Sequence, residues 1–277
     1  MSRGLQILSL SVVISAGVVT ASCGMHAQPA PAGFFSNGDV KLSYQFTKPT
    51  GRGPFPGVVI GHGSGEVRKE ECRYLALSFE RRGYATLCYD KRGVGQSTGK
   101  YSNVGTVNSE KMFALLAGDM AAGVKFLAAH PDVDPRRIGL AGSSQAGWII
   151  PLAATTAQPK PAFMVILSGP TVPVGEEIHF SRFAENTMSP VEDAYAELDK
   201  FTGPHGFDPA PTLRTVEVRG LWLLGLDDRS IPIRDTIRIL DGLIKSGKPF
   251  QHVDFPGAGH NLRGADIWTA IDAFLRS

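Results

Sequence analysis

One stretch decides the fold of this chain, and it reads Arg137-Ile138-Gly139-Leu140-Ala141-Gly142-Ser143-Ser144-Gln145-Ala146-Gly147-Trp148. It starts with a short apolar run, continues through small residues around Ser144, and passes into a helix-forming run. This order predicts a buried strand, a sharp turn and a helix. Such a unit is typical of a strained turn that pushes a serine hydroxyl out above a sheet, so Ser144 is the candidate nucleophile.

Apolar runs alternate with helical patterns along most of the chain. The expected strands cover 39–46, 57–61, 85–89, 138–141, 163–167, 220–224 and 250–255, and the expected helices cover 70–82, 108–130, 145–156, 234–246 and 265–276. The first strand alternates in polarity and is expected at an edge, whereas the strand 57–61 is a continuous apolar run, as in a sheet covered on both faces. Strands that alternate with helices predict an α/β fold with a doubly wound, mostly parallel sheet.

Residues 171–214 interrupt this alternation. They are more polar, and they hold two short helical patterns, over 177–186 and 190–201. We expect them to form a short helical lid insertion rather than a separate domain. The α/β domain as a whole is expected to span 39–277.

The composition fits one large globular domain. The chain has 277 residues, of which 43% are hydrophobic and 19% are charged. Its formal net charge is +2, without a basic run or an acidic tail, so neither nucleic acid nor an anionic membrane surface is expected as a partner. It has no CxxC, no HExxH and no Cys/His cluster, so we expect no metal site and no cofactor.

The first 22 residues are expected to be an export signal, because Arg3 precedes an apolar run of signal-peptide length. Two cleavage sites for this signal are compatible with the sequence. Val19-Thr20-Ala21 suits signal peptidase, whereas Thr20-Ala21-Ser22-Cys23 resembles a lipobox. A lipobox usually has an aliphatic residue at the position that Thr20 occupies here. An uncleaved anchor is the alternative. Membrane contact is expected only through a lipid on Cys23, and residues 23–38 are expected to be a tether.

Export would place the mature chain in the periplasm, on the outer membrane as a lipoprotein, or outside the cell. Such compartments are oxidising. Cys72 and Cys88 could then form a disulfide, or they could be two partly buried thiols, because a helix-to-strand pair often has the wrong separation. The sequence leaves both interpretations open.

Two serines compete for the role of nucleophile. Gly95-Gln96-Ser97-Thr98-Gly99 matches the pattern G-x-S-x-G letter for letter, whereas the stretch around Ser144 ends in Ala146. Ser97 lies in a glycine-rich loop with no helix after it. Ser144 has a strand before it and a helix after it, so we prefer Ser144. Its alternative role is that of a helix N-cap.

A serine nucleophile needs a base that an acid orients, in the chain order Ser, Asp or Glu, His. His260 lies in a loop just past the last strand, where open α/β sheets place their ligand sites. We therefore predict that His260 is the base. Asp227 and Asp228 follow the preceding strand, and the residues by themselves do not choose between them.

The negative charge that develops on a substrate oxygen needs amide donors. The amide of Gln145, directly after the nucleophile, is one candidate. The second is expected from the glycine-rich loop 62–65 after the strand 57–61, where glycines let the backbone approach a substrate. We favour the amide of Ser64, with that of Gly63 second.

Five segments together resemble the α/β-hydrolase superfamily, and within it the exported bacterial esterases related to the dienelactone-hydrolase and prolyl-oligopeptidase-like groups. They are Gly61–Gly65, Tyr89–Ser97, Gly142–Gly147, Gly225–Pro232 and Gly257–His260. The acid turn of these esterases often reads G-x-x-D-x-x-[VI]-P, which implies that Asp228 is the acid. The resemblance also implies an α/β-hydrolase fold and a structural role for the loop that carries Ser97.

The expected function is that of a serine hydrolase, carboxylesterase-like and of class EC 3.1.1. It would cleave small-molecule carboxylic esters of small or medium acyl groups through an acyl-enzyme intermediate. A prolyl-oligopeptidase-like peptidase is an alternative, although 277 residues leave no room for a propeller domain. A thioesterase and a non-catalytic binding protein are the others. The sequence determines neither the natural substrate nor the oligomeric state.

Overall fold

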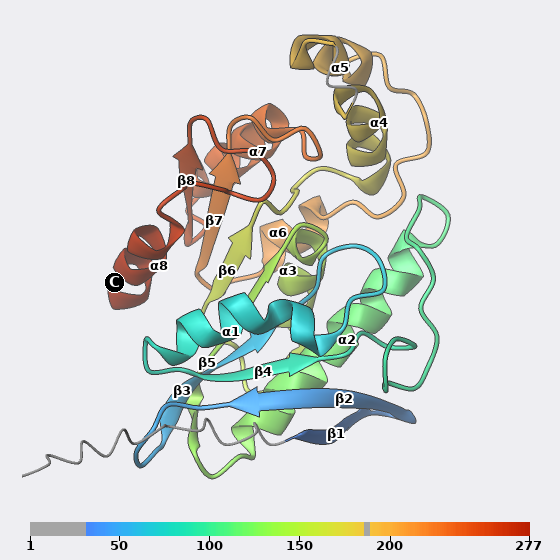
Figure 1. Ribbon diagram of the computed structural model, residues 1–277. Helices are drawn as coiled ribbons and strands as arrows, with labels where there is room; N and C mark the ends of the chain where they lie inside the picture. The colour runs from blue at the N-terminus through green and yellow to red at the C-terminus, as the bar shows by residue number, and fades with distance from the viewer. Residues whose placement is uncertain (1–31, 186–188) are drawn as a thin grey trace, which may run out of the picture.

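The computed structural model describes residues 32–185 and 189–277, and the expected export signal and the lipidation of Cys23 lie outside them. Within these residues, eight strands form one sheet in the order β1-β2-β4-β3-β5-β6-β7-β8 (Figure 1). The strands are β1 (Ala32–Asn37), β2 (Val40–Thr47), β3 (Phe55–Ile60), β4 (Ala85–Tyr89), β5 (Val133–Ser143), β6 (Met164–Leu167), β7 (Gly220–Gly225) and β8 (Phe250–Phe255).

The sheet is mostly parallel, as the sequence predicts. Only the β1–β2 and β2–β4 pairs are antiparallel, and all pairs from β4 to β8 are parallel. The chain runs from β3 to β4 in one direction and then returns to place β5 on the other side of β3. The carboxyl ends of β3 and β5 therefore lie at the point where the strand order reverses, and open α/β sheets bind ligands at such points.

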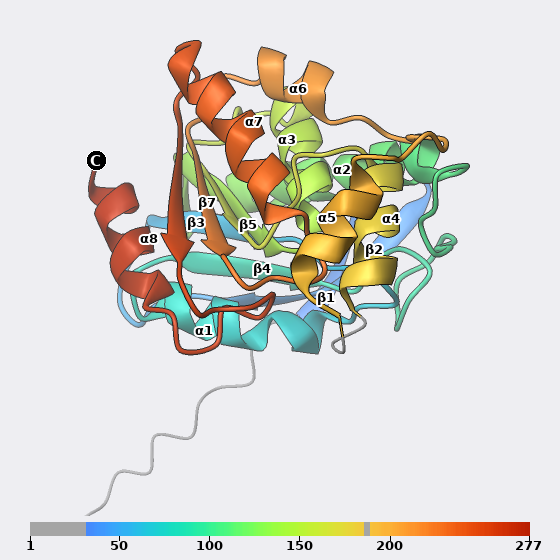
Figure 2. The same ribbon diagram turned by 90° about the horizontal axis from the view of Figure 1, so that it is seen from above.

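Helices cover both faces of the sheet. They are the short 3-10 helix η1 (Lys69–Cys72) and the helices α1 (Arg73–Glu80), α2 (Ser109–Ala128), α3 (Ala146–Thr156), α4 (Val174–Ala184), α5 (Val191–Leu198), α6 (Ala210–Thr215), α7 (Ile233–Lys245) and α8 (Ile267–Arg276). Figure 2 shows α1 and α8 on one side of the sheet and α2, α3 and α7 on the other.

The two helical layers enclose two hydrophobic cores. Along β3, Val58 and Ile60 belong to the core under α1 and α8, whereas Val59 belongs to the core under α2 and α3. This alternation follows from the period of two along a strand. Since both faces are buried, the strand reads as a continuous apolar run, which is why the sequence pattern predicts it well.

The lid insertion has a small core of its own. Phe180 and Ala184 of α4 pack against Ala194 and Tyr195 of α5, and the two helices lie side by side above the rest of the molecule (Figure 1). Both helices start near the residues predicted. The insertion also contains α6, a third helix that the sequence patterns do not predict. In the described part of the chain, no helix has the length and hydropathy that a membrane span needs.

The structure corrects the N-terminal boundary of the domain. Residues 32–37, expected within the tether 23–38, form β1 and pair with β2, so β1 rather than the strand at 39–46 is the edge. The reason is the side chain of Phe35, which is buried against Tyr89 and Phe126.

Cys72 and Cys88 are joined by a disulfide in this structure. It links the end of η1 to β4, which resolves the alternative that the sequence leaves open.

Candidate active site

The turn at Ser144 has the strained conformation expected of a nucleophile. Its φ is 56°, in the left-handed region that residues other than glycine rarely adopt. The Ser144 amide donates to the carbonyl of Leu167 at 2.9 Å, and the Gly147 amide donates to the carbonyl of Ser144 at 2.8 Å. These bonds hold the turn between β5 and α3. Backbone strain of this kind is common at functional sites.

Small residues allow the turn to close. A methyl group at Gly142 would come within 2.7 Å of the Ala146 Cβ, and one at Gly147 would come within 2.7 Å of the Gly169 Cα. Ala146 therefore fits in the last position of the serine motif because Gly142 opposite it has no side chain. The departure from G-x-S-x-G does not disturb the local packing.

His260 and Asp228 lie in direct contact. The Nδ1 of His260 lies 2.8 Å from the Asp228 Oδ2. The other carboxylate oxygen accepts hydrogen bonds from the amides of Ser230 and Ile231, at 2.8 and 3.0 Å. Asp228 is buried, whereas Asp227 is exposed and its amide donates to the carbonyl of Ala258. Of the two adjacent aspartates, the structure places Asp228 against the imidazole.

The contact with Asp228 sets the tautomer and the basicity of His260. A carboxylate only accepts, so Nδ1 carries the proton and Nε2 is left to act as a base. Burial alone would lower the pKa of His260, but the hydrogen bond and the charge of Asp228 outweigh it and the pKa is raised. Among the described residues, no hydrogen bond joins His260 to Ser144. Hydrogen bonds between a catalytic base and its nucleophile often tighten only when substrate binds.

The predicted oxyanion loop lies beside Ser144. The Gly61 amide donates to the carbonyl of Ala141 at 2.7 Å, which ties the ends of β3 and β5 together. A methyl group at Gly63 would lie 3.8 Å from the Ser144 Cβ. Among the described residues, the amides of Gly63, Ser64 and Gln145 donate no hydrogen bond to the protein. The three amides therefore stay candidates for the oxyanion hole.

Sequence reasoning missed Lys91, which holds this loop. Its side chain is fully buried, and the ammonium donates to the carbonyls of Gly63 and Gly65 at 2.7 and 2.8 Å. A third bond, of 3.3 Å, reaches the Oε1 of Gln145. Burial lowers the pKa of Lys91 to about 8. In the sequence, the only signal that could have pointed to Lys91 is its place just before Gly93 and Gly95 of the glycine-rich loop.

Ser97, the competing serine, has its hydroxyl engaged elsewhere. It is buried, donates to the carbonyl of Asp90 at 2.7 Å, and accepts from the amide of Ser43 at 2.9 Å. These bonds join the loop after β4 to β2. The arrangement is that of a structural serine.

A second unpredicted residue, Glu177 on α4 of the lid, interacts electrostatically with His260. Burial raises the pKa of Glu177 to about 7, although the nearby charge of His260 acts in the opposite direction. Glu177 and Glu185 in turn help to raise the pKa of His260. Within the described ranges, no group of three or more His, Cys, Asp or Glu side chains is placed to hold a metal ion.

Residues 71–275 match the prolyl oligopeptidase family. The chain belongs to this family. A putative carboxymethylenebutenolidase from Synechocystis sp. is 23% identical over 260 residues, which are 87% of this chain and 94% of that protein. The quorum-quenching protein AidA from Acinetobacter baumannii is 29% identical over 113 residues, which are 41% of this chain and 35% of that protein.

The solved structures agree with the family. An esterase from Pyrococcus furiosus has a TM-score of 0.66 at 19% identity, over 89% of this chain and 90% of that one. This likeness shows the α/β-hydrolase fold. The chain spans about a third or less of the length of three of the curated relatives that it matches. The family match and the shared fold place this chain in the prolyl oligopeptidase family, with the α/β-hydrolase fold.

Proposed function

We propose that this protein is a serine carboxylesterase that cleaves esters of small or medium acyl groups. The observation that carries the proposal is the 2.8 Å contact between His260 and Asp228, downstream of a serine held at a strained strand-to-helix turn. Nucleophile, acid and base follow in the chain order of α/β hydrolases. Each also lies at the carboxyl end of a parallel strand.

The proposed reaction has two steps. In the first, the Oγ of Ser144 attacks the acyl carbon while the Nε2 of His260 takes its proton and passes it to the leaving alcohol. Asp228 stabilises the imidazolium. The amide of Gln145, with that of Ser64 or Gly63, binds the oxygen on which charge develops. In the second step, water attacks the acyl carbon while His260 takes a proton from it. The bond between that carbon and the Ser144 Oγ then breaks, His260 returns the proton to the Oγ, and the carboxylic acid product leaves.

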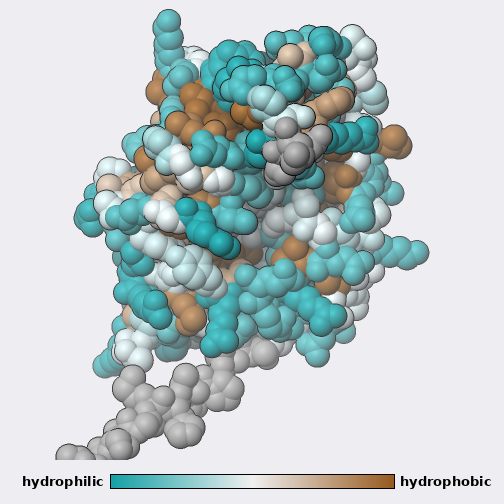
Figure 3. Space-filling model, turned by 45° about the horizontal axis from the view of Figure 1, so that its top comes forward, coloured by the Kyte–Doolittle hydropathy of each residue, from teal (hydrophilic) through white to brown (hydrophobic). Residues whose placement is uncertain are grey.

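The character of the surface favours soluble esters over a lipid interface. Figure 3 shows a face that is largely hydrophilic, with separate hydrophobic patches. Among the described residues, the exposed large hydrophobic side chains come from separate segments of the chain: Phe34, Tyr74, Val107, Phe183 and Leu226. An enzyme that binds a lipid surface needs a larger continuous apolar patch.

A peptidase is the second candidate, because the family to which the chain belongs is named for an oligopeptidase. Matched p-nitrophenyl esters and p-nitroanilides with the same acyl group distinguish the two functions. We expect turnover of the esters, with a maximum at a short or medium acyl chain. Turnover of peptidyl anilides without turnover of the esters would contradict the proposal and favour the peptidase.

The choice of nucleophile is tested by two alanine variants. Ser144→Ala should abolish both ester turnover and labelling by a fluorophosphonate. Ser97→Ala should keep both, although the free energy of unfolding of this variant should be lower. Activity that survives Ser144→Ala contradicts the assignment. A folded wild-type protein that no fluorophosphonate labels would favour the non-catalytic binding protein.

A further inference from the structure

Lys91 has no role in the proposed reaction, yet it contacts both sides of the predicted oxyanion hole. An ammonium group has three donors. In Lys91 one donates to Gly63, one to Gly65 and one to the side chain of Gln145. The amide group of that Gln145 side chain donates in turn to the Oγ of Ser64, at 3.4 Å. The loop 63–65 is thereby held against the residue that follows the nucleophile.

The bond to Gly63 also has an electronic consequence. The carbonyl of Gly63 and the N–H of Ser64 belong to the same peptide group. A cation that binds the carbonyl oxygen withdraws electron density across the planar amide, so the N–H becomes a stronger donor. Lys91 thus acts on the favoured oxyanion donor without touching the substrate.

The charge of Lys91 is not neutralised by its contacts. Its three acceptors are uncharged oxygens, and its fourth neighbour is the ring of Tyr101, whose centroid lies 4.5 Å from the Nζ. The hydroxyl of Tyr101 accepts from the Gly65 amide at 3.2 Å. A buried cation without a carboxylate in contact exerts a stronger field on its surroundings than a paired one does.

We infer that Lys91 is a positioning residue for the oxyanion hole, which fixes the loop 63–65 and strengthens the Ser64 amide in the transition state. This inference rests on the proposed ester hydrolysis at Ser144. It predicts an effect on the chemical step rather than on substrate binding, because the charge on the oxygen is greatest in the transition state.

The test compares Lys91→Met, which keeps the length of the side chain, with Lys69→Met. Lys69 lies in η1 and pairs with Asp90 at 3.1 Å, but it contacts no carbonyl of the oxyanion loop. In Lys91→Met we expect kcat per fluorophosphonate-titrated site to fall about 10- to 100-fold with KM nearly unchanged. The affinity for a trifluoromethyl ketone should fall by the same factor. Lys69→Met should stay within about threefold of wild type.

Two results overturn the inference. One is a kcat per titrated site in Lys91→Met that equals that of wild type. The other is a loss expressed in KM, without a matching loss of ketone affinity. A purely structural role would reduce the number of titratable sites and leave the turnover of each remaining site intact.

If Lys91→Met does not fold, the pH dependence of kcat in the wild-type enzyme tests the inference instead. The other charged or titratable groups around the ammonium are His62, Lys69, Glu71, Asp90 and Tyr101. Burial, assisted by the charge of Lys91, lowers the pKa of His62 to about 4. Burial raises the pKa of Tyr101 above its usual value. Neither His62 nor Tyr101 therefore changes its charge in the pH range in which Lys91 loses its proton.

The kcat of the wild-type enzyme should therefore fall above about pH 8, as Lys91 loses its proton. Lys91→Arg, whose guanidinium stays charged, should remove this fall. A kcat that stays flat to about pH 10, or an alkaline fall that Lys91→Arg leaves in place, overturns the inference. The proposed function fails separately, if Ser144→Ala retains ester turnover. If Ser144→Ala is inactive and Lys91→Met is fully active, only the role of Lys91 fails.

Discussion

At the scale of single residues, the burial of Asp228 is balanced by hydrogen bonds. Its two oxygens bind the amides of Ser230 and Ile231 and the imidazole of His260. These three donors satisfy a carboxylate that lies away from water. Its neighbour Asp227 is exposed and lacks this environment. The two residues are adjacent in sequence but differ completely in surroundings.

The first prediction concerns these two aspartates. Asp228→Asn should lower kcat/KM about 10³- to 10⁴-fold, because an amide cannot hold the imidazole in the tautomer that leaves Nε2 free as a base. Asp227→Asn should have little effect. Ester kinetics on the two purified variants make the comparison, and the opposite ranking would mean that Asp227 is the acid.

The second prediction concerns Glu177 in the lid. Its carboxylate stabilises the protonated form of His260 and raises the pKa of that histidine. Glu177→Gln should therefore lower the pKa of His260 and move the acid limb of kcat/KM to lower pH. Glu176→Gln is the matched control, because Glu176 pairs with His205, 3.1 Å away. A pH profile that moves equally in both variants would contradict a specific effect of Glu177.

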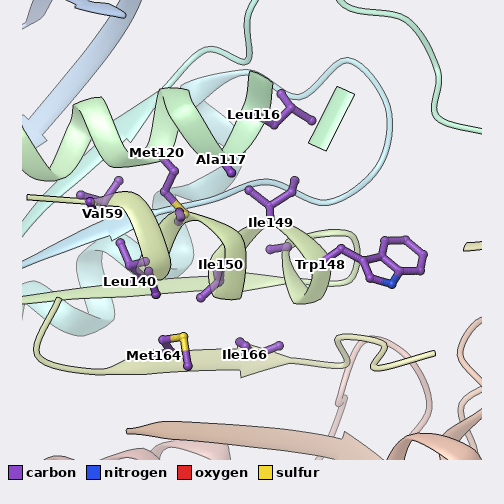
Figure 4. Packing of buried hydrophobic residues seen from close by; sticks show 14 of the residues in the cluster. Val59, Leu116, Ala117, Met120, Leu140, Trp148, Ile149, Ile150, Met164 and Ile166 are labelled. Atoms are coloured by element: carbon purple, nitrogen blue, oxygen red, sulfur yellow. The ribbon is translucent and has the colours of Figure 1, made fainter. Parts of the chain in front are cut away.

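At the scale of elements, helix α3 positions Ser144 by packing tightly. Figure 4 shows Trp148, Ile149 and Ile150 of α3 among side chains of α2 and the neighbouring strands. Trp148 also donates to the carbonyl of Val172 at 2.8 Å, at the start of the lid insertion. The helix is buried on nearly all sides. Its start therefore has little freedom to move away from the turn.

The third prediction tests the contact between α3 and the segment after β6. Gly147→Ala places a methyl group 2.7 Å from the Gly169 Cα. We expect a loss of about 1–3 kcal/mol in the free energy of unfolding, and a reduced kcat, because the helix must shift. Gly242→Ala, in α7 with nothing within 4 Å of the added methyl, should instead gain about 0.4–1 kcal/mol. Urea unfolding of both variants is the measurement, and equal stabilities would refute the close contact.

At the scale of the whole molecule, a buried ion pair joins three distant segments. Arg92, in the loop after β4, forms two hydrogen bonds with Asp119 of α2, at 2.6 and 2.7 Å. The side chain of Asn37, at the end of β1, donates to the same carboxylate at 2.9 Å. Edge strand, loop and helix thus meet at one carboxylate that is inaccessible to solvent.

The fourth prediction follows from this burial. Asp119→Ala leaves the guanidinium of Arg92 buried without its partner and should cost about 3–5 kcal/mol of unfolding free energy. The double variant Arg92→Met/Asp119→Leu removes both charges and should recover most of that loss. Chemical denaturation of the single and double variants checks this. A single variant as stable as wild type would show that the pair does not hold the segments together.

Local patterns in the sequence determined the framework of this protein. The strand, turn and helix around Ser144 are set by neighbouring residues, since buried strands read as apolar runs and the turn needs small residues on each side. The succession of strands and helices along the chain from residue 39 onward, and the loop position of His260, follow from the same patterns. These features need no contact between distant segments, so the chain itself reveals them.

Only the tertiary structure decided which side chains meet. The burial of Asp228 depends on how the turn after β7 faces the loop after β8. Lys91 reaches Gly63 and Gln145 because β4, β3 and β5 lie side by side, and Glu177 approaches His260 because the lid folds back over the sheet. These contacts join residues far apart in the chain. Their directions are set by strand register and helix packing, for which no local pattern carries a signal.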